Sequence, residues 1–404
     1  MFKKTFPNGV TCLAIKASNK APVNISAYFP GGRLFETEAN SGITYLLLQF
    51  MLNKYRSLNK DSKVLDQISI ENHADFCGFS LNVAKEDLTV ALRTLFQLLT
   101  LPIKESSYLK EEKDTSLREI QRTSTDLLRR PVELFYQSLF AGHPYAFSRH
   151  GTESTVESIS FDQMMDWREE VIHLDQLNIV ISGSIAPEQI LDEVFEIFGM
   201  VTTEKRPFRA SVLPLIPFKK FLPRIEQSKS DRTSVVVGHK GVDSKDHRYD
   251  DLEVLRHWLA GTKGKLHLSL REKLSLAQSV NAYNVSLLRG GAFFLHAIAK
   301  AEDENKLVDY LTAFFSSLNK VAISKEDFEA AKKQAISLYL QGLQSNDALS
   351  YHMASQLIAG KDPTKHDDYE TRIGKVQHSK MMSVMKEIFS EELYAIGIVR
   401  GTHG

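Results

Sequence analysis

The sequence has few of the features that mark a secreted, membrane or nucleic-acid-binding protein. Its 404 residues include only two cysteines, Cys12 and Cys77, and no Cys-x-x-Cys pair. Two cysteines exclude a disulfide framework and are typical of a reducing compartment. Lys+Arg and Asp+Glu both total 50, so the formal net charge is zero. A neutral chain is not built to bind nucleic acid or an anionic membrane through bulk charge.

Long hydrophobic runs are also missing. The longest, Ile43 to Leu52, includes Thr44 and Gln49 and is about half as long as the ~20 residues that a membrane span needs. Near the N-terminus, Pro7-Asn8-Gly9 stands where a signal peptide would have its apolar segment. We therefore expect no membrane association and a cytoplasmic location.

The composition is that of a soluble globular protein. Hydrophobic residues make up 43% and charged residues 25% of the chain, close to the averages for such proteins. This amount of apolar material is enough for full-sized cores. At ~100–200 residues per domain, two domains are the simplest interpretation.

The sequence predicts strands and helices in the same order in both halves. Alternating apolar residues indicate strands, and apolar residues spaced three and four apart indicate helices. Strands are predicted at Val10–Ile15, Val23–Phe29, Phe79–Val83, Asn178–Ser182, Thr233–Val237, Ala292–Ala299 and Tyr394–Val399, and helices at Gly42–Lys54, Leu88–Leu99, Glu105–Leu128, Asp251–Leu259, Leu307–Leu318 and from Ser324 onward.

This order suggests a duplicated domain. The sequence numbers of Phe79 and Phe293 differ by 214, and those of Gly183 and Gly401 differ by 218. A nearly constant offset is typical of an internal repeat, although two unrelated α+β domains would also alternate strands and helices. Residues 203–222 contain three prolines and are predicted to be a linker. The predicted domains are therefore 1–202 and 223–404.

Local catalytic motifs are missing. No two of the thirteen histidines lie three or four residues apart, and no Gly-x-Ser-x-Gly or phosphate-loop motif occurs. Residues 261–265 are basic and contain two glycines, but a turn is the better interpretation. A metal site built from distant residues stays open at this point.

The order of several short motifs over the whole chain resembles the pitrilysin/insulinase family of inverzincin metallopeptidases. No single motif is decisive, but chance would not keep so many in register. They are Pro7-Asn8-Gly9-Val10, Gly31-Gly32-Arg33-Leu34-Phe35-Glu36, Ser41-Gly42-Ile43, Ser116-Leu117-Arg118-Glu119-Ile120, His143-Pro144-Tyr145 with Gly151-Thr152, Ser182-Gly183, Leu270-Arg271-Glu272-Lys273 with Leu276-Ala277 and Ser279, Gly290-Gly291 and Gly401.

The resemblance implies that the catalytic metal site is degenerate. The family's H-x-x-E-H motif supplies two zinc ligands and a general base, and the matching positions here hold Tyr45, Leu48 and Gln49. Those side chains cannot replace two imidazoles and a carboxylate. The resemblance also places the third ligand at Glu119, with Glu112 on the same helix face. Because the helix that carries the degenerate motif is apolar nearly all round, we expect it to be buried on both sides. The face with the degenerate motif would pack within the protein, or alternatively against a partner.

In members of the family, the second half of the chain contributes an Arg and a Tyr, seven residues apart, that hold the substrate. Arg271 matches the Arg, whereas Gln278 stands at the Tyr position. An ion pair of Arg271 with Glu272 or with another helix carboxylate is an equally good interpretation. Tyr283 reads as a strand residue, Gly290-Gly291 as a hairpin turn with a minor alternative role in gating peptides, and His143-Pro144-Tyr145 as a structural motif.

The resemblance implies an α+β fold of two homologous domains, each a mainly antiparallel sheet with helices packed on one face, together forming a half-shell. It implies a non-catalytic subunit of a two-chain zinc metallopeptidase that encloses unfolded peptides. No cofactor is expected in this chain, because zinc would be bound only by a homologous catalytic partner with H-x-x-E-H. The alternatives are a scaffold or peptide-binding pseudopeptidase, self-associated or in another complex like the core subunits of the cytochrome bc complex, and an enzyme with an unrecognised site.

Overall fold

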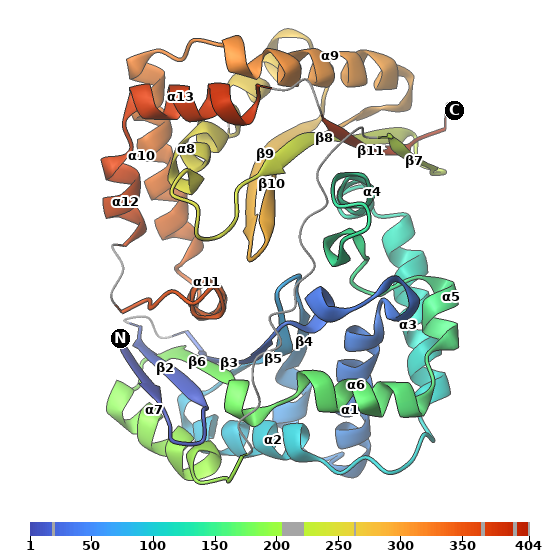
Figure 1. Cartoon of the computed structure of the whole chain (residues 1–404), viewed down its shortest axis with the longest axis vertical. Helices are drawn as coiled ribbons and strands as arrows, with labels where there is room; N and C mark the ends of the chain where they lie inside the picture. Colours follow the sequence, from blue (N-terminus) through green and yellow to red (C-terminus); the bar gives the residue numbers. More distant parts are fainter. Residues whose placement is uncertain (18–20, 204–221, 262–263, 365–367, 391–393, 403–404) are drawn as a thin grey trace. The chain divides into compact units, whose positions relative to one another are not determined.

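The chain folds as two compact units, each with its own sheet and core. The computed structural model describes residues 1–17, 21–203, 222–261, 264–364, 368–390 and 394–402 (Figure 1). Unit 1 comprises Met1–Ile120, Ser148–Val212 and Gly342–His366, and unit 2 comprises Gln121–Phe147, Leu213–Gln341 and Asp367–Gly404. Most of the predicted linker, 203–222, lies outside the described residues.

Unit 1 contains a six-stranded sheet in the order β1-β2-β6-β3-β5-β4. All neighbouring strands are antiparallel except β2 and β6, which are parallel. The strands are β1 (Phe2–Thr5), β2 (Thr11–Lys16), β3 (Val23–Pro30), β4 (Ile68–Asn72), β5 (Phe76–Val83) and β6 (Asn178–Gly183).

Unit 2 repeats this sheet without a counterpart of β1 among the described residues. Its order is β7-β11-β8-β10-β9, in which only β7 and β11 are parallel. The matching strand order and directions support the duplication that the sequence predicts. The strands are β7 (Arg224–Gln227), β8 (Arg232–Gly241), β9 (Ser279–Leu287), β10 (Gly290–Lys300) and β11 (Ala395–Arg400).

Strand register refines the equivalence of the two sheets. Leu81 pairs with Ile25 and Ile25 with Ile181, and in unit 2 Leu295 pairs with Val237 and Val237 with Ile396. When Leu81 is matched with Leu295 at the predicted offset of 214, this register matches Ile181 with Ile396 at an offset of 215. The predicted offsets of 214 and 218 therefore disagree with each other by three positions in strand register. Gly401 follows the end of β11, whereas Gly183 is the last residue of β6.

The helices cover the sheets. In unit 1 they are α1 (Ile43–Leu58), α2 (Leu88–Thr100), α3 (Leu109–Ser124), which runs on past Ile120, α5 (Glu153–Ser158), α6 (Phe161–Val171), α7 (Pro187–Val194) and α11 (Asn346–Ile358). In unit 2 they are α4 (Arg130–Leu139), α8 (Tyr249–Leu259), α9 (Glu304–Ser317), α10 (Lys325–Gly342), α12 (Tyr369–Lys375) and α13 (His378–Ile388). No helix within the described ranges is both long and apolar enough to cross a bilayer.

The core of unit 1 lies between its sheet and four helices. Alternate strand residues such as Ile25, Phe79 and Ile181 face α1 and α2, whose leucines are buried in the same cluster. Met164 of α6 and Ile190 of α7 complete this cluster. This arrangement confirms the predicted α+β fold and places the main layer of helices on one face of the sheet.

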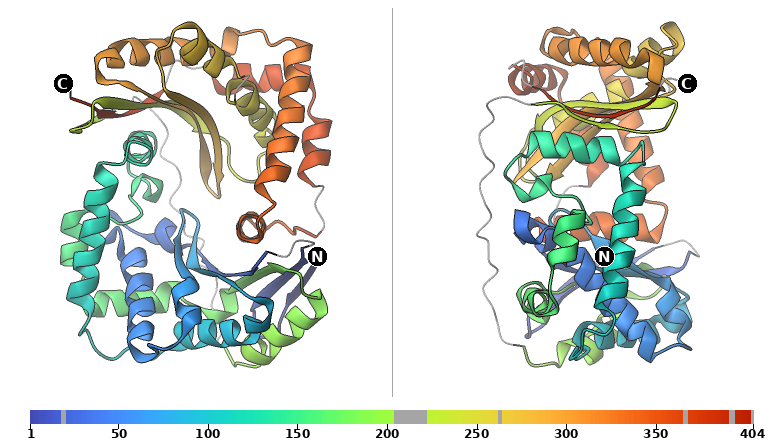
Figure 2. Two further views of the ribbon diagram at one scale, coloured as in Figure 1. Left: turned by 180° about the vertical axis from the view of Figure 1, so that it is seen from behind. Right: turned by 90° about the vertical axis from the view of Figure 1, so that its right-hand side faces the viewer.

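Each unit also takes one helix from the other half of the chain, which the predicted boundaries did not include. Residues 121–147, with α4, belong to unit 2, and residues 342–366, with α11, belong to unit 1. Helix α11 packs on β6 and β3, and α4 packs on β11 and β8 (Figures 1 and 2). Both helices lie on the sheet face opposite the main helical layer, so each sheet is covered on both sides.

Two predicted elements differ in detail from the structure. The helix predicted at Glu105–Leu128 is α3, which is shorter at both ends. The hairpin turn predicted at Gly290-Gly291 is formed instead by Leu288 and Arg289, and both glycines belong to β10. A Cβ added at Gly291 would lie 2.2 Å from the Val242 carbonyl oxygen, so this position needs a glycine because other backbone passes it closely.

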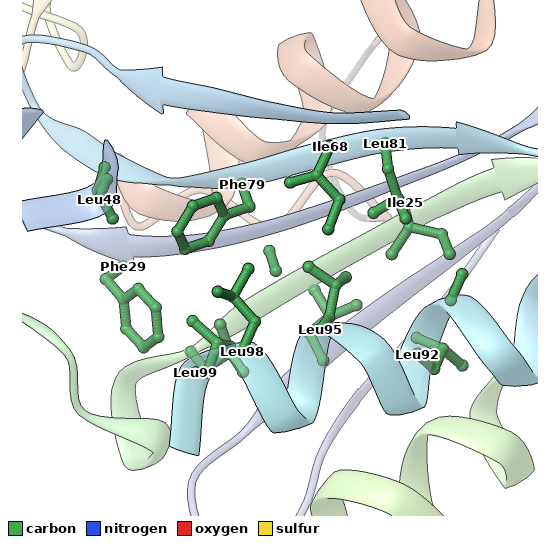
Figure 3. Packing of buried hydrophobic residues seen from close by; sticks show 14 of the residues in the cluster. Ile25, Phe29, Leu48, Ile68, Phe79, Leu81, Leu92, Leu95, Leu98 and Leu99 are labelled. Atoms are coloured by element: carbon green, nitrogen blue, oxygen red, sulfur yellow. The ribbon is translucent and has the colours of Figure 1, made fainter. Parts of the chain in front are cut away.

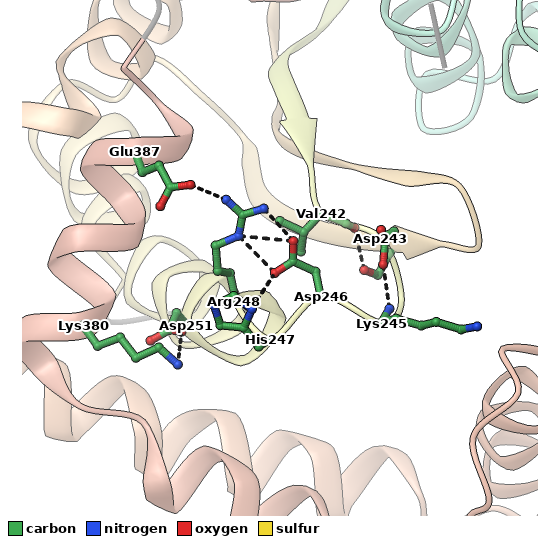
Figure 4. A network of polar contacts seen from close by, with 10 residues as sticks. Val242, Asp243, Lys245, Asp246, His247, Arg248, Asp251, Lys380 and Glu387 are labelled. Carbon is green, nitrogen blue, oxygen red and sulfur yellow. Dashed lines mark hydrogen bonds and ion pairs between the residues drawn. The ribbon is translucent and has the colours of Figure 1, made fainter. Parts of the chain in front are cut away.

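Helix α8 is held by partly buried charges. Its start is fixed by Arg248, which bonds Asp246 and Glu387 of α13 (Figure 4). Further along, Glu253 Oε1 accepts hydrogen bonds from Arg256 Nη2 at 2.6 Å and from the Tyr369 hydroxyl of α12 at 3.2 Å. These contacts join α8 to α12 and α13.

The surroundings of Glu253 set its protonation. Burial favours the neutral acid, but the hydrogen bond from His257 and the charge of Arg256 outweigh it and lower the pKa of Glu253 to about 2. The folded state therefore holds this carboxylate ionised at a pH where the unfolded chain, with a pKa near 4.5, binds a proton. Stability from Glu253 is present above pH 4.5 and is lost as the pH falls toward 2.

We expect Glu253→Gln to destabilise unit 2 by about 3 kcal/mol at pH 7, because it leaves the partly buried Arg256 without its charged partner. Below pH 4.5 the difference from the wild type should shrink, since the wild-type carboxylate loses its advantage as it protonates. Urea unfolding between pH 7 and pH 3 measures this, with the exposed Glu326→Gln as control. If the stability difference between the wild type and Glu253→Gln stayed the same from pH 7 to pH 3, the lowered pKa of Glu253 would be wrong.

Candidate functional site

The helix that carries the degenerate motif begins at a buried carboxylate. Glu36 accepts hydrogen bonds from the backbone N–H groups of Gly42, at 2.9 Å, and Thr44, at 3.1 Å. A carboxylate at this end of a helix satisfies free N–H groups and interacts favourably with the helix dipole. Burial raises the pKa of Glu36, and the two backbone hydrogen bonds oppose that rise. The start of α1 is therefore fixed in place.

Leu48, at the position of the family's general base, lies in the core of unit 1. Its side chain is 0% exposed and belongs to the cluster of Phe29 and Phe79 (Figure 3). Leu52, one turn later, is also buried. The prediction that α1 is buried on both sides is confirmed, and this part of the former metal face packs within the protein.

Gln49, at the second histidine position, is bonded to α3. Its side-chain amide donates to Glu112 Oε2 at 2.5 Å and to the Glu112 main-chain oxygen at 3.0 Å. The amide of Asn53, one turn further along α1, donates to both carboxylate oxygens of Glu112 at 2.9 Å. Glu112 is 3% exposed, and two amides of α1 thus hold its carboxylate.

The protonation of Glu112 reflects two opposing effects. Burial raises its pKa above the usual range, and the hydrogen bonds from Gln49 and Asn53 lower it again without cancelling the rise. Burial thus favours the neutral acid, and the amide donors favour the ionised form. In either state, three amide–carboxyl contacts from Gln49 and Asn53 join α1 to α3.

Tyr45, at the first histidine position, is enclosed by two residues that follow the His143-Pro144-Tyr145 motif in the chain. The ring of His150 lies edge-on to it at a centroid distance of 4.5 Å. The guanidinium carbon of Arg149 lies 5.2 Å from the ring centre, which is the geometry of a cation–π contact. Arg149 also donates to the Ile70 carbonyl oxygen at 2.7 Å.

Glu119, the predicted counterpart of the third zinc ligand, lies two turns after Glu112 on α3. It is half-buried, and its charge acts on the Tyr45 hydroxyl. Burial raises the pKa of Tyr45, Arg149 lowers it, and Glu119 and Glu112 raise it further. The structure thus places Tyr45 and Gln49 beside the two α3 carboxylates, whereas Leu48 points into the core.

These residues do not fit a zinc ion. A protein zinc site needs three or four nitrogen, sulfur or oxygen ligands that converge on one point. Here the Gln49 amide nitrogen faces Glu112 as a donor, Leu48 has no ligand atom, and Tyr45 is a neutral phenol. Nowhere in the described ranges do three or more His, Cys, Asp or Glu side chains gather in a way that could hold a metal.

Sequence reasoning missed part of this site. Asn53 had a usable signal, because a second amide four residues after Gln49 lies on the same helix face. Arg149 and His150 had none, since they follow α1 by about a hundred residues and reach it only through the fold. A carboxylate on a helix face is usually solvated, and the burial of Glu112 is a tertiary effect.

The predicted substrate-holding residues lie in unit 2. Arg271 belongs to a π-helical segment, His267–Lys273, and Gln278 precedes β9. Both side chains are exposed. Between them, Ser275 has a φ of 49°, a left-handed conformation that is unusual for a residue other than glycine. Unusual helical turns and strained backbone often occur at functional sites.

Arg271 is not paired with Glu272. Glu272 instead lies 3.7 Å from His267, and among the described residues no hydrogen bond or ion pair involves the Arg271 side chain. The ion-pair interpretation of Arg271 is therefore wrong for the described part of the chain. The guanidinium is available to a ligand.

Other sequence motifs have structural places. Tyr283 lies in β9 and stacks on Phe294 with ring centres 4.8 Å apart, as expected for a strand residue. The backbone N–H of Tyr145 donates to the His143 ring, and the Tyr145 hydroxyl accepts from the backbone N–H of Arg289 at 3.1 Å. The His143-Pro144-Tyr145 motif thus supports the β9–β10 hairpin of unit 2, in line with its structural interpretation.

Known proteins with similar sequences and folds identify the class. Residues 158–335 match the family described as "Peptidase M16 inactive domain". "Uncharacterized zinc protease YmxG" of Bacillus subtilis (strain 168) is 22% identical over 98% of this chain and 97% of that protein. "Cytochrome b-c1 complex subunit 1, mitochondrial" of Mus musculus is 19% identical over 95% of this chain and 83% of that protein. The crystal structure of a protease from Helicobacter pylori covers 99% of both chains with a TM-score of 0.84 and 15% identity.

The family predicted from the sequence is therefore confirmed. Residues 158–335 match the inactive domain of this family (M16), and the sequence contains no H-x-x-E-H motif. The solved structure adds that the shared fold extends over essentially the whole length.

Restoring the motif should not restore the metal site. We expect the triple variant Tyr45→His, Leu48→Glu, Gln49→His to bind no stoichiometric zinc. Leu48→Glu puts an unpaired carboxylate into the core, at a cost of several kcal/mol, and Gln49→His breaks the hydrogen bonds to Glu112. Metal analysis after dialysis and the thermal midpoint measure both effects.

The double variant Tyr45→His, Gln49→His is the matched control, because it keeps Leu48 in the core. It should remain folded and bind zinc only weakly. Tight stoichiometric zinc in the triple variant, with an unchanged thermal midpoint, would contradict the account of Leu48 given above.

Proposed function

We propose that this chain is a non-catalytic subunit of a two-chain zinc metallopeptidase. It forms part of the wall of a chamber that encloses unfolded peptides, and a homologous partner with H-x-x-E-H binds the zinc and performs catalysis. The proposal includes a cytoplasmic location. The alternative is a pseudopeptidase that binds peptides or acts as a scaffold without a peptidase partner.

The conversion of the metal face of α1 carries this proposal. Leu48 has become core, and Gln49 has become the hydrogen-bond partner of Glu112. A site that had lost its ligands by drift would keep an open face, whereas here all three positions of the former motif have a new packing or hydrogen-bonding contact. In this proposal α1 is held by protein contacts and needs no metal. The chain then acts through its surface, as part of the wall of the peptide chamber.

Support for a partner chain comes from the relatives. The Mus musculus protein is, by its name, a subunit of the cytochrome b-c1 complex, and other members of the family are named as zinc proteases. The family therefore includes chains that work inside larger assemblies. The first of these names favours the scaffold alternative and the second favours a peptidase complex.

A role for Arg271 rests on its exposure and on its freedom from Glu272. A guanidinium with several free N–H groups can hold a peptide carbonyl or carboxylate in a fork of hydrogen bonds. Gln278 supplies an amide donor from the other end of the same loop, in place of the family's phenol. The strained Ser275 lies between them.

The partner is tested by purifying the chain from its native host and identifying the co-purifying proteins by mass spectrometry. We expect one stoichiometric chain of similar size that contains H-x-x-E-H. Recovery of this chain alone, or with unrelated proteins, would exclude the two-chain peptidase and favour the scaffold.

The role of Arg271 is tested in the complex that co-purifies. Arg271→Ala should lower peptide turnover roughly tenfold, mainly through the KM, because a charged hydrogen bond to substrate is worth ~1.5–3 kcal/mol. Lys273→Ala is the matched control, since Lys273 is also exposed and basic but is two residues away. Equal effects of the two substitutions would assign the loss to net charge and remove Arg271 from the site.

A further inference from the structure

The outer face of the unit 1 sheet is a docking surface for a helix. Strand residues that alternate with the inner core, among them Leu13, Tyr28, Phe76 and Val180, form a second apolar cluster with Ala354 and Leu357 of α11. Tyr28 and Val180 are at most 1% exposed, and Ala354 is 0% exposed. The first half of the chain therefore has an apolar face whose cover comes from the second half.

Polar contacts fix the position of α11 on this face. The Ser182 hydroxyl lies 2.7 Å from the Asn346 carbonyl oxygen and 2.8 Å from the Ser350 hydroxyl. The Asn346 side chain donates to the Pro22 carbonyl oxygen at 2.7 Å. Buried hydrogen bonds of this kind select one register of the helix, because any shift would leave them unpaired.

The outer face of the unit 2 sheet docks α4 in the same way. A Cβ added to Gly397 of β11 would lie 2.2 Å from the Pro131 carbonyl oxygen and 2.4 Å from the Phe135 nitrogen. The backbone of α4 thus rests directly on the strand, which only a glycine permits. The Phe135 ring, 0% exposed, packs on Phe294 at a centroid distance of 5.0 Å.

Hydrogen bonds also fix α4. Arg130 makes two bonds to the Glu226 carboxylate of β7, at 2.7 Å and 2.5 Å. The Ser138 hydroxyl donates to the Leu222 carbonyl oxygen at 2.9 Å. Just before α4, the Leu127 carbonyl oxygen accepts from the Ser234 hydroxyl of β8 at 2.7 Å.

The two docking positions are equivalent by strand register. Ser182 follows Ile181 as Gly397 follows Ile396, and the two isoleucines are equivalent in the two sheets. Both units therefore place a small residue at the same point of the same strand and receive a helix there. The exchange is reciprocal, since each half of the chain gives one helix and receives one.

We propose that residues 1–202 and residues 223–404 are specific binding partners for each other, and that they stay assembled through α4 and α11 when the chain between them is cut. The continuity of the chain through 204–221 is then unnecessary for holding the halves together. The partner that each outer sheet face recognises is an amphipathic helix from the other half of the same chain.

The test uses the full-length protein with a specific-protease site inserted within 204–221. The protein is folded, cleaved, and passed over a native sizing column, and cleavage is checked on a denaturing gel. We expect both fragments in one peak that contains them in equal amounts. Separation of the fragments under native conditions would overturn the proposal.

Variants of the docking surfaces decide whether the helices are responsible. Ala354→Asp places a charge on the docked face of α11 and should weaken the association of the cleaved halves roughly tenfold or more, because it buries an unpaired carboxylate. Phe135→Ala combined with Ser350→Ala is a milder variant that leaves a cavity and removes a hydroxyl. It serves the same purpose if the first variant does not fold before cleavage.

The exposed Asp347→Ala on α11 is the matched control. It should leave the association unchanged. If the docking variants fold, are cleaved, and associate as tightly as this control, the halves are held elsewhere and the proposal fails.

Discussion

Both sheets of this protein are buried on both faces, and the rest of the fold follows from that constraint. In unit 1 the inner face contains Ile25, Phe79 and Ile181, and the outer face contains Tyr28 and Val180. A sheet of this kind is stable only with cover on each side. The helices that follow the strands in sequence cover one side, and the second side is covered by a helix from the other half of the chain.

Because of this exchange, the folded units do not coincide with the two halves of the sequence. The sequence repeat divides the chain into two halves of similar length, but neither half contains all the material of one unit. The duplication is visible in strand order, and the folded units are built across it. A substitution in α11 therefore acts on the sheet of the first half, although it lies in the second.

The positions of α1 that match the family's metal motif have structural contacts in this protein. In an active relative, the ligands of α1 would be held toward a metal and kept free of other contacts. Here Gln49 and Asn53 donate to Glu112, and Leu48 packs with Phe29. The link between α1 and α3 that a metal would provide is thus made here by hydrogen bonds between side-chain amides and the Glu112 carboxyl group.

Much of the fold could be predicted from the sequence, because strand and helix periodicity is local. The strands Val23–Pro30 and Phe76–Val83 and the helix Leu88–Thr100 were predicted within three residues at each end. The burial of α1 followed from its apolar surface on all sides. The exchange of α4 and α11 could not be predicted, since nothing in an amphipathic pattern says which sheet a helix will cover.

In the candidate site, too, local sequence features could be predicted and contacts between distant segments could not. Tyr45, Leu48 and Gln49 were identified because motif order is preserved along the chain. The contact of Arg149 with Tyr45 and the burial of Glu112 depend on distances through space that only the fold sets. The exposure of Arg271 could not be predicted either, because the sequence was equally compatible with an ion pair between Arg271 and Glu272.

The reciprocal helices have a consequence for synthesis on the ribosome. The unit 1 sheet is complete once β6 ends at Gly183, but its second cover, α11, ends only at Ile358. At ~5–20 residues per second, the intervening stretch takes roughly 9 to 35 s to make. During that time Tyr28, Phe76 and Val180 face the solvent on the nascent chain. The growing polypeptide thus carries an uncovered apolar surface through nearly half of its translation, and this interval is when chaperones have a defined place to bind.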